Sequence, residues 1–145
     1  MKKDFKKILK DAGLKATDAR LAILSILSEG GAPETAEGIH RKIKKSRLPA
    51  GRQGTDFATV YRTLSAFLKS GILKKVDLRR ESVYYELADN KNHHHHIVCT
   101  NCGLVEDFEN RETEKLAEKI AKKSAKFKSI SEHSFEFFGL CRKCA

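Results

Sequence analysis

Two pairs of cysteines constrain this chain more than any other feature of its sequence. Cys99 and Cys102 are two residues apart, as are Cys141 and Cys144, and these are the only cysteines among the 145 residues. Two thiolates with this spacing can face one metal ion, and two such pairs complete a tetrahedral zinc site with no open coordination position. The 38 residues between the pairs can hold a helix and a strand, which would return the second pair beside the first. We therefore predict a structural Zn²⁺ at these cysteines; structural thiols or a redox pair are the less favoured alternatives.

A run of four histidines precedes the first cysteine pair, inside a strand predicted over residues 93–99. Side chains alternate between the two faces of a strand, so His93 and His95 should face one way and His94 and His96 the other. Imidazole binds several divalent metals, and each pair could begin its own metal site. The alternative is a solvated polar tract. Further ligands are available in Glu86, Asp107, Glu114 and His133.

Positive charge is concentrated in the first part of the chain. Residues 1–87 hold 19 Lys and Arg against 10 Asp and Glu, whereas residues 88–145 hold 10 against 9. This excess suits binding of a polyanion such as duplex DNA, although solubility alone can also explain a basic half.

The clearest predicted helix covers residues 56–70, with Asp56 as its N-cap and Gly71 beyond its end. One face of this helix is an apolar stripe, and the opposite face is small or basic and contains no acid. We interpret it as a helix that enters a groove. The stripe comprises Phe57, Val60, Leu64, Phe67 and Leu68, and the opposite face comprises Thr59, Arg62, Ala66 and Lys69.

The elements around this helix predict a winged-helix domain over residues 1–87. Helices are predicted over residues 3–12, after an N-cap at Thr17, and after an N-cap at Thr35. Residues 48–54 are predicted to be a loop, and residues 72–78 and 83–87 two strands joined by a basic tip. The recognition helix would read the major groove while the hairpin reaches phosphate or the minor groove.

The polar segment 88–92 is predicted to be a hinge, followed by a small α/β domain over residues 93–145. In this domain strands are predicted over residues 93–99, 104–108 and 130–138, and a helix over residues 112–127. The fold class is therefore α+β.

Four motifs, in order and at compatible spacing, resemble the ferric-uptake-regulator (Fur) family over nearly the whole chain. They are Gly13-Leu-Lys-Ala-Thr17 with Arg20; Ala58-Thr-Val-Tyr-Arg-Thr-Leu64; the histidine run leading into Cys99-Thr-Asn-Cys-Gly103; and His133 followed by Phe138-Gly-Leu-Cys141. The resemblance implies a winged helix hinged to a dimerisation domain, with a metal controlling how the two DNA-reading heads are presented.

The resemblance also assigns residues to sites. It implies structural zinc at the four cysteines, and a regulatory site at Glu86, His94, His96 and Asp107. A further site within the dimerisation domain would comprise His93, His95, Glu114 and His133, where the family often has Asp at the position of His95. Tyr61 and Arg62 match the base-reading pair, Lys15 matches a lysine that enters the minor groove, and Arg20 and Thr59 complete the expected DNA-binding set.

Two segments depart from the family pattern. The regulatory site usually takes a His just before the third helix, and here Pro33 occupies that position. Glu34 could substitute, and His40 is a weaker candidate. The segment from Pro49 to Gly54 looks like an insertion before the recognition helix.

The expected function is a metal-responsive regulator, in most of the family a repressor, of metal-uptake or peroxide-defence genes. It would bind an operator in double-stranded DNA as a homodimer, with Zn²⁺ as structural ion and Fe²⁺, Zn²⁺ or Mn²⁺ as regulatory ion. Asp107 in place of Glu is the choice seen in the peroxide-sensing branch, but the sensed signal stays open.

Two other classes of function compete with this interpretation. One is a metal store, and the other is a zinc hydrolase with Glu114 or Asp107 as general base, although no His-Glu-x-x-His motif is present. No apolar run is long enough to span a membrane, and the start of the chain has no signal-peptide pattern. A location in the cytoplasm is therefore expected. Because no catalytic motif is present, we also expect a protein without enzymatic activity.

Overall fold

A computed structural model describes residues 4–52, 54–88, 94–131 and 133–145, so the predicted hinge at 88–92 lies almost entirely outside the described residues. The chain divides into two compact units, residues 1–88 and 89–145, and each is described by itself. None of the described helices is long and apolar enough to cross a membrane.

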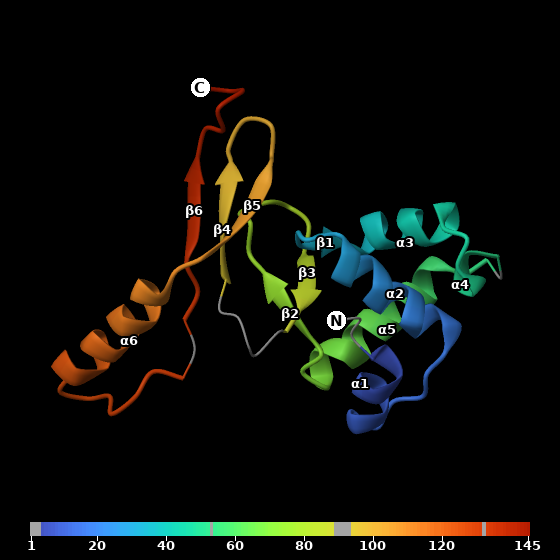
Figure 1. The fold of residues 1–145 in the computed structure, drawn as a ribbon, viewed down its shortest axis with the longest axis horizontal. Coiled ribbons are helices and arrows are strands. Elements are labelled where there is room, and N and C mark those ends of the chain that lie inside the picture. The colour runs from blue at the N-terminus through green and yellow to red at the C-terminus, as the bar shows by residue number, and fades with distance from the viewer. Residues whose placement is uncertain (1–3, 53, 89–93, 132) are drawn as a thin grey trace. The chain divides into compact units, whose positions relative to one another are not determined.

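The first unit is a helical bundle with a small antiparallel sheet (Figure 1). The sheet order is β1-β3-β2, so the hairpin of β2 and β3 is extended by β1. The helices are α1 (Phe5–Asp11), α2 (Asp18–Glu29), α3 (Ala36–Lys45), α4 (Pro49–Arg52) and α5 (Phe57–Lys69), and the strands are β1 (Glu34–Thr35), β2 (Leu73–Val76) and β3 (Tyr84–Leu87).

Three helices begin at the N-caps that the sequence predicts. The side chains of Thr17, Thr35 and Asp56 each accept a hydrogen bond from the backbone N–H three residues further on. Such a bond satisfies one of the amides that a helix leaves free at its start. These caps fix the beginning of α2, α3 and α5.

The core of the first unit is built from the apolar faces of α2, α3 and α5. Within the predicted stripe of α5, Val60, Leu64 and Phe67 are buried, while Phe57 and Leu68 are half-buried against the same core. The opposite face of α5 therefore remains available to solvent, as the residue pattern predicted. The other large side chains that are fully buried are Leu9, Ile23, Leu24, Ile39 and Ile43.

Two features of the first unit differ from the prediction. The segment 48–54, predicted to be a loop, contains the helical turn α4. It packs so closely on the end of α3 that a Cβ on Gly51 would lie 2.4 Å from the carbonyl oxygen of Ile43. β1 was also not predicted, because two residues carry no recognisable period; its pairing with β3 creates the strand.

The second unit contains a three-stranded sheet of order β5-β4-β6 and one helix. β4 (His94–Cys99) pairs antiparallel with β5 (Val105–Glu109) and parallel with β6 (Glu136–Gly139), and α6 spans Arg111–Lys123. Two predictions need correction here: α6 ends before Phe127, and the predicted strand 130–138 is a strand only from Glu136. A strand forms only where its backbone can pair with a neighbouring strand, whatever the alternation of its residues. β4 pairs with this segment only from Glu136 onward.

Several apolar side chains of the second unit are exposed. On α6 and just after it, Leu116, Ile120 and Phe127 are 44, 49 and 69% exposed. On and beside the sheet, Ile97, Phe137 and Leu140 are also exposed. Exposed apolar surface on this scale is typical of an interaction face.

Candidate metal centres and DNA-binding face

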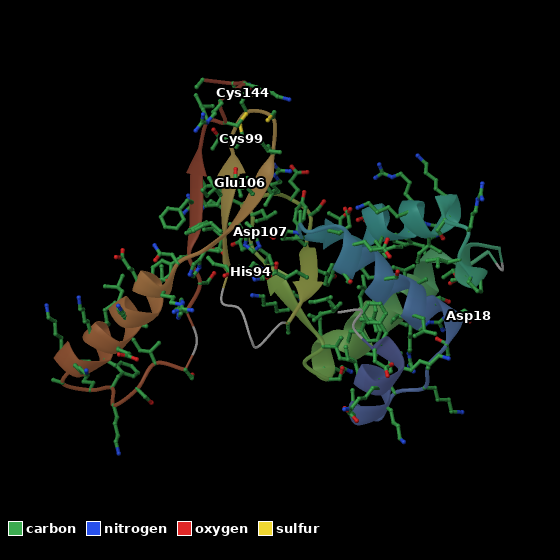
Figure 2. All side chains as sticks on the ribbon, in the orientation of Figure 1. Asp18, His94, Cys99, Glu106, Asp107 and Cys144 are labelled. Atoms are coloured by element: carbon green, nitrogen blue, oxygen red, sulfur yellow. The ribbon has the colours of Figure 1, made fainter. Side chains whose placement is uncertain are left out.

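The four cysteines converge at one end of the second unit's sheet. Cys99 ends β4, and Cys141 and Cys144 follow β6, which runs parallel to β4 and ends beside it (Figure 2). The four Sγ atoms all lie within 4.8 Å of one another, and those of Cys102 and Cys141 are 3.7 Å apart. Sulfurs about 2.3 Å from a tetrahedral zinc ion lie roughly 3.8 Å from one another. The predicted cysteine cluster is therefore present, and its donor set and spacing fit Zn²⁺.

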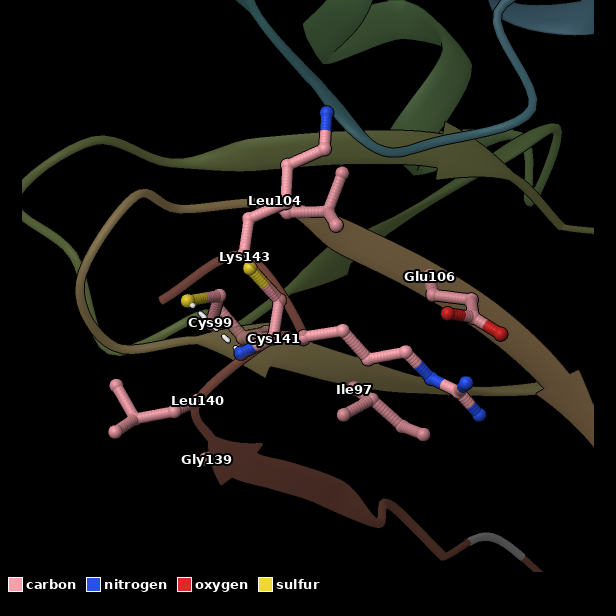
Figure 3. Close-up of a pocket in the computed structure, with 10 residues that line it drawn as sticks. Ile97, Cys99, Leu104, Glu106, Gly139, Leu140, Cys141 and Lys143 are labelled. Atoms are coloured by element: carbon pink, nitrogen blue, oxygen red, sulfur yellow. Dashed lines mark hydrogen bonds between the residues drawn. The ribbon is translucent and has the colours of Figure 1, made fainter. Parts of the chain in front are cut away.

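The surroundings of the cluster stabilise the thiolate of Cys99. The backbone N–H of Cys141 donates to Cys99 Sγ at 3.3 Å (Figure 3). Backbone hydrogen bonds from Cys102 and Cys141 lower the pKa of Cys99 from 9.0 to about 5. The Asn101 side chain acts to lower the pKa of Cys144, but hydrogen bonds with the Cys141 and Cys102 thiols raise it overall to about 11. Four thiolates this close together would repel one another, so a bound cation is needed to stabilise all four at once.

A cavity of about 370 Å³ lies beside this cluster and is lined largely by apolar side chains (Figure 3). Ile97 comes from β4, Leu104 immediately precedes β5, and Leu140 comes from the segment leading to Cys141. The cavity thus continues the exposed apolar surface of the second unit up to the cysteines.

Three of the four predicted regulatory ligands lie together in the second unit. His94 and His96 point to the same side of β4, with ring centroids 5.2 Å apart, as strand alternation predicted. His96 is paired in register with Asp107 of β5, and its Nε2 lies 3.6 Å from Asp107 Oδ1. Ligands about 2.1 Å from a shared ion lie roughly 3–3.5 Å apart. His96 is buried and Asp107 is partly exposed, so the arrangement is open to an ion from solvent.

The fourth predicted regulatory ligand, Glu86, belongs to the first unit. It lies in β3, is buried, and its Oε1 is 2.8 Å from Lys74 Nζ on the paired strand. The residues near the position where the family usually has a histidine have roles within this unit: Glu34 pairs with Lys42, and His40 Nε2 lies 3.1 Å from the carbonyl oxygen of Thr55.

On the other face of β4, His95 lies in an aromatic cluster. Its ring is 5.6 Å from that of His133 and 5.5 Å from that of Phe108. Burial, and then the neighbouring His133, lower the pKa of His95, which favours the neutral imidazole. His93 lies outside the described residues, and so does the side chain of Glu114. Two members of the predicted further site are therefore brought together.

A residue that the sequence reasoning missed engages His95. Thr113 Oγ1 lies 2.8 Å from His95 Nε2 and donates its own proton to the carbonyl oxygen of Asn110 at 2.6 Å. A metal ion bound through Nε2 of His95 would have to displace this hydrogen bond. Nothing in the spacing of Thr113 and His95 along the chain indicates that they meet.

The exposed face of α5 carries the predicted base-reading residues. Tyr61 is 43% exposed and its ring packs edge-on against Phe57, with centroids 4.8 Å apart. Arg62 is exposed, and its guanidinium lies 3.5 Å from Thr59 Oγ1. Tyr61 is therefore accessible to solvent. Lys15 precedes α2 and Arg20 lies in its first turn, and Arg20 Nη1 donates to the Lys15 carbonyl oxygen at 2.8 Å.

The tip of the hairpin is also basic. Arg79 adopts a positive φ of 52°, and its backbone N–H donates to Asp77 Oδ1 at 2.8 Å. The Arg80 guanidinium lies over the Tyr84 ring, 5.9 Å from its centroid. The hydrogen bond to Asp77 thus fixes the backbone of the turn that carries Arg79 and Arg80.

Comparisons with known proteins agree with this architecture. The model of the ferric uptake regulator family matches residues 11–138. The ferric uptake regulation protein of Neisseria gonorrhoeae is 36% identical over 137 residues, which cover 94% of this chain and 90% of that protein.

Solved structures show the same likeness. The Vibrio cholerae ferric uptake regulator has a TM-score of 0.77 at 32% identity, with 95% of this chain and all of that chain covered. The Helicobacter pylori ferric uptake regulator has a TM-score of 0.76 at 27% identity, with 96 and 87% covered.

A basic winged helix together with a unit that gathers clusters of metal ligands defines a metal-responsive transcription regulator. The matched model and relatives make the attribution specific: the chain belongs to the ferric uptake regulator family. Proteins of this family are dimeric DNA-binding regulators.

Proposed function

We propose that this chain is a cytoplasmic repressor, without enzymatic activity, that binds operator DNA as a homodimer when a regulatory divalent ion is bound. The proposed regulatory ligands are Glu86, His94, His96 and Asp107. The observation that carries the proposal is the approach of His96 and Asp107 to 3.6 Å, with His94 on the same side of the strand. This donor set suits Fe²⁺, Zn²⁺ or Mn²⁺, because it combines imidazoles with carboxylate.

The cysteine cluster has a different role in this proposal. A closed site of four thiolates holds its zinc for folding and leaves no position for exchange. The Helicobacter pylori protein is described as having three functional metal-binding sites. We propose a corresponding third site at His93, His95, Glu114 and His133 of this chain. An ion bound there through His95 Nε2 would replace the hydrogen bond between Thr113 and His95.

The mechanism we propose is thermodynamic linkage. Glu86 comes from the unit that reads DNA, whereas His94, His96 and Asp107 come from the other unit, so an ion bound by all four would restrict how the two are arranged. Such an ion favours DNA binding only by its differential affinity for the competent arrangement, typically about 1–3 kcal/mol. DNA must then tighten metal binding by the same factor.

For DNA recognition we propose that α5 lies in the major groove. Tyr61 and Arg62 would read base edges, Thr59 would support Arg62, and Lys15 and Arg20 would contact the backbone or minor groove. The exposure of Tyr61 and Arg62 on a face without acid supports this assignment. The exposed apolar side chains Leu116, Ile120 and Phe127 support dimerisation through the second unit.

A metal titration of DNA binding tests the proposal. A duplex selected from a randomised pool in the presence of Mn²⁺ is labelled, and fluorescence anisotropy gives its affinity with Fe²⁺, Zn²⁺, Mn²⁺ or chelator, under anaerobic conditions for iron. His96→Ala should weaken binding at limiting metal while retaining one zinc per chain and the parent circular dichroism spectrum. Equal affinity of variant and parent across the titration would contradict the assignment of the regulatory site.

A further inference from the structure

The end of α3 and the turn α4 form a strongly basic segment that the predicted DNA-binding residues do not include. Residues 38–55 contain six Lys and Arg and no Asp or Glu. Lys42 is paired with Glu34. Four of the others, Arg41, Lys44, Lys45 and Arg47, are exposed, and we call them the α3–α4 basic edge.

The basic edge lacks the carboxylates that would neutralise it. In residues 4–52, 54–88, 94–131 and 133–145, no ion pair joins these four side chains to an acid. A helix surface that serves only solubility usually mixes both signs of charge, as α6 does with its three glutamates. The edge is thus a local concentration of positive charge.

Contacts within the first unit place this edge beside the recognition helix. His40 of α3 reaches the start of α5, with Nε2 3.1 Å from the Thr55 carbonyl oxygen and its ring 5.3 Å from that of Phe57. Phe57 in turn packs against Tyr61. Lys44 lies four residues after His40 and therefore on the same side of α3, one turn further along. At least Lys44 of the basic edge therefore lies on the side of α3 that faces the start of α5.

The backbone of the edge is held in place. Ser46 Oγ donates to the carbonyl oxygen of Ile43 at 2.7 Å, and Thr55 Oγ1 donates to that of Ala50 at 2.8 Å. The close approach of Gly51 to Ile43 leaves α4 no room to move toward α3. A positioned segment loses less conformational entropy on binding than a mobile loop does.

We propose that the α3–α4 basic edge binds phosphate oxygens of duplex DNA next to the groove that α5 enters. In helix-turn-helix proteins the helix before the recognition helix crosses the DNA backbone. Lysine and arginine contacts to phosphate strengthen binding to any sequence, and they fix register without reading bases. The inference rests on the proposed DNA-binding function and enlarges the DNA surface that each head covers.

Salt dependence separates this role from a purely structural one. Cations in the last turn of α3 also stabilise its C-terminus, which would affect thermal unfolding but not the salt dependence of DNA binding. Removing one lysine that binds a phosphate should reduce the slope of log affinity against log salt concentration by about 0.9.

The test compares the parent with Lys44→Gln/Lys45→Gln. The matched control is Lys126→Gln/Lys128→Gln, which removes the same charge from an exposed segment of the second unit. Affinities for the selected duplex and a scrambled duplex are measured between about 50 and 200 mM salt, at saturating metal.

We expect the edge variant to have a slope smaller by about 1–2, an unchanged ratio of specific to scrambled affinity, and a thermal stability no more than slightly below that of the parent. The control should keep the parent slope. An edge variant with the parent slope, or a control whose slope falls as much as that of the edge variant, would overturn the inference. Failure of the proposed function would instead show as parent binding that does not respond to metal.

Discussion

Replacing Cys102 by serine should unfold the second unit or separate the dimer while leaving the first unit folded. Among the described residues of the second unit, only Val98 and Cys99 are buried apolar side chains. Burial of Val98 contributes about 1.5–3 kcal/mol, and Cys99 is a zinc ligand, whereas ordering the backbone costs about 1–2 kcal/mol per residue. Apolar burial within one protomer is therefore small for a unit of this length.

Structural zinc supplies the missing stability in this account. Apparent binding free energies of such zinc sites are about 10–16 kcal/mol near neutral pH, comparable with or larger than the net stability of a whole domain, about 5–15 kcal/mol. Contacts of the exposed apolar side chains across a dimer would add to it. Loss of one of four thiolates removes most of this contribution, because the remaining site is incomplete.

The assay combines calorimetry, zinc analysis and light scattering on the full chain. Thr100→Ser is the matched control, because it lies in the same turn, keeps a hydroxyl and is not a ligand. We expect two unfolding transitions, one zinc per chain and a dimer for the parent and the control. Cys102→Ser should keep the transition of the first unit, which has its own core, and lose zinc and the second transition. A dimeric Cys102→Ser variant with both transitions unchanged would refute the reasoning.

Three further predictions concern the first unit. Arg62→Ala should weaken binding to the selected duplex by about 1–3 kcal/mol in anisotropy titrations, and a variant with full sequence preference would argue against base reading. Gly51→Ala should lower stability by about 1–3 kcal/mol in denaturant unfolding, because its Cβ would meet the Ile43 carbonyl oxygen; an unchanged midpoint would contradict that packing. Hydrogen bonds from Thr59 hold the pKa of Asp56 below 3.8, so its stabilisation should be complete above that pH and be lost as pH falls through the lowered pKa. Thermal unfolding of Asp56→Ala and parent should therefore differ at pH 7 and converge in acid, and a difference that persists in acid would be inconsistent with the cap.

Local sequence signals predicted the parts of the structure that depend on neighbours along the chain. A cap such as Thr35 acts on an amide three residues away, and the stripe of α5 repeats within four residues, so both can be read directly. The cysteine cluster was predictable for a related reason, since each Cys-x-x-Cys pair is itself local. The alternation of His94 and His96 followed from the geometry of a single strand.

Features that depend on contacts between distant segments were not predictable in this way. α4 is stabilised by packing on α3, where Gly51 alone fits, and β1 exists only because β3 pairs with it. The hydrogen bond between His95 and Thr113 joins residues 18 apart. The residue pattern of one segment does not indicate which distant segment it contacts.

In the proposed mechanism the regulatory ion controls DNA binding. The direct measurement is the affinity of the dimer for the selected duplex, with zinc retained at the cysteines, in the presence of the regulatory metal and after its removal at the same salt concentration. We predict tighter binding with metal by roughly 5–150-fold, together with an equal increase in metal affinity when the duplex is present. Equal affinity of the two forms would contradict the claim, even with both units fully folded.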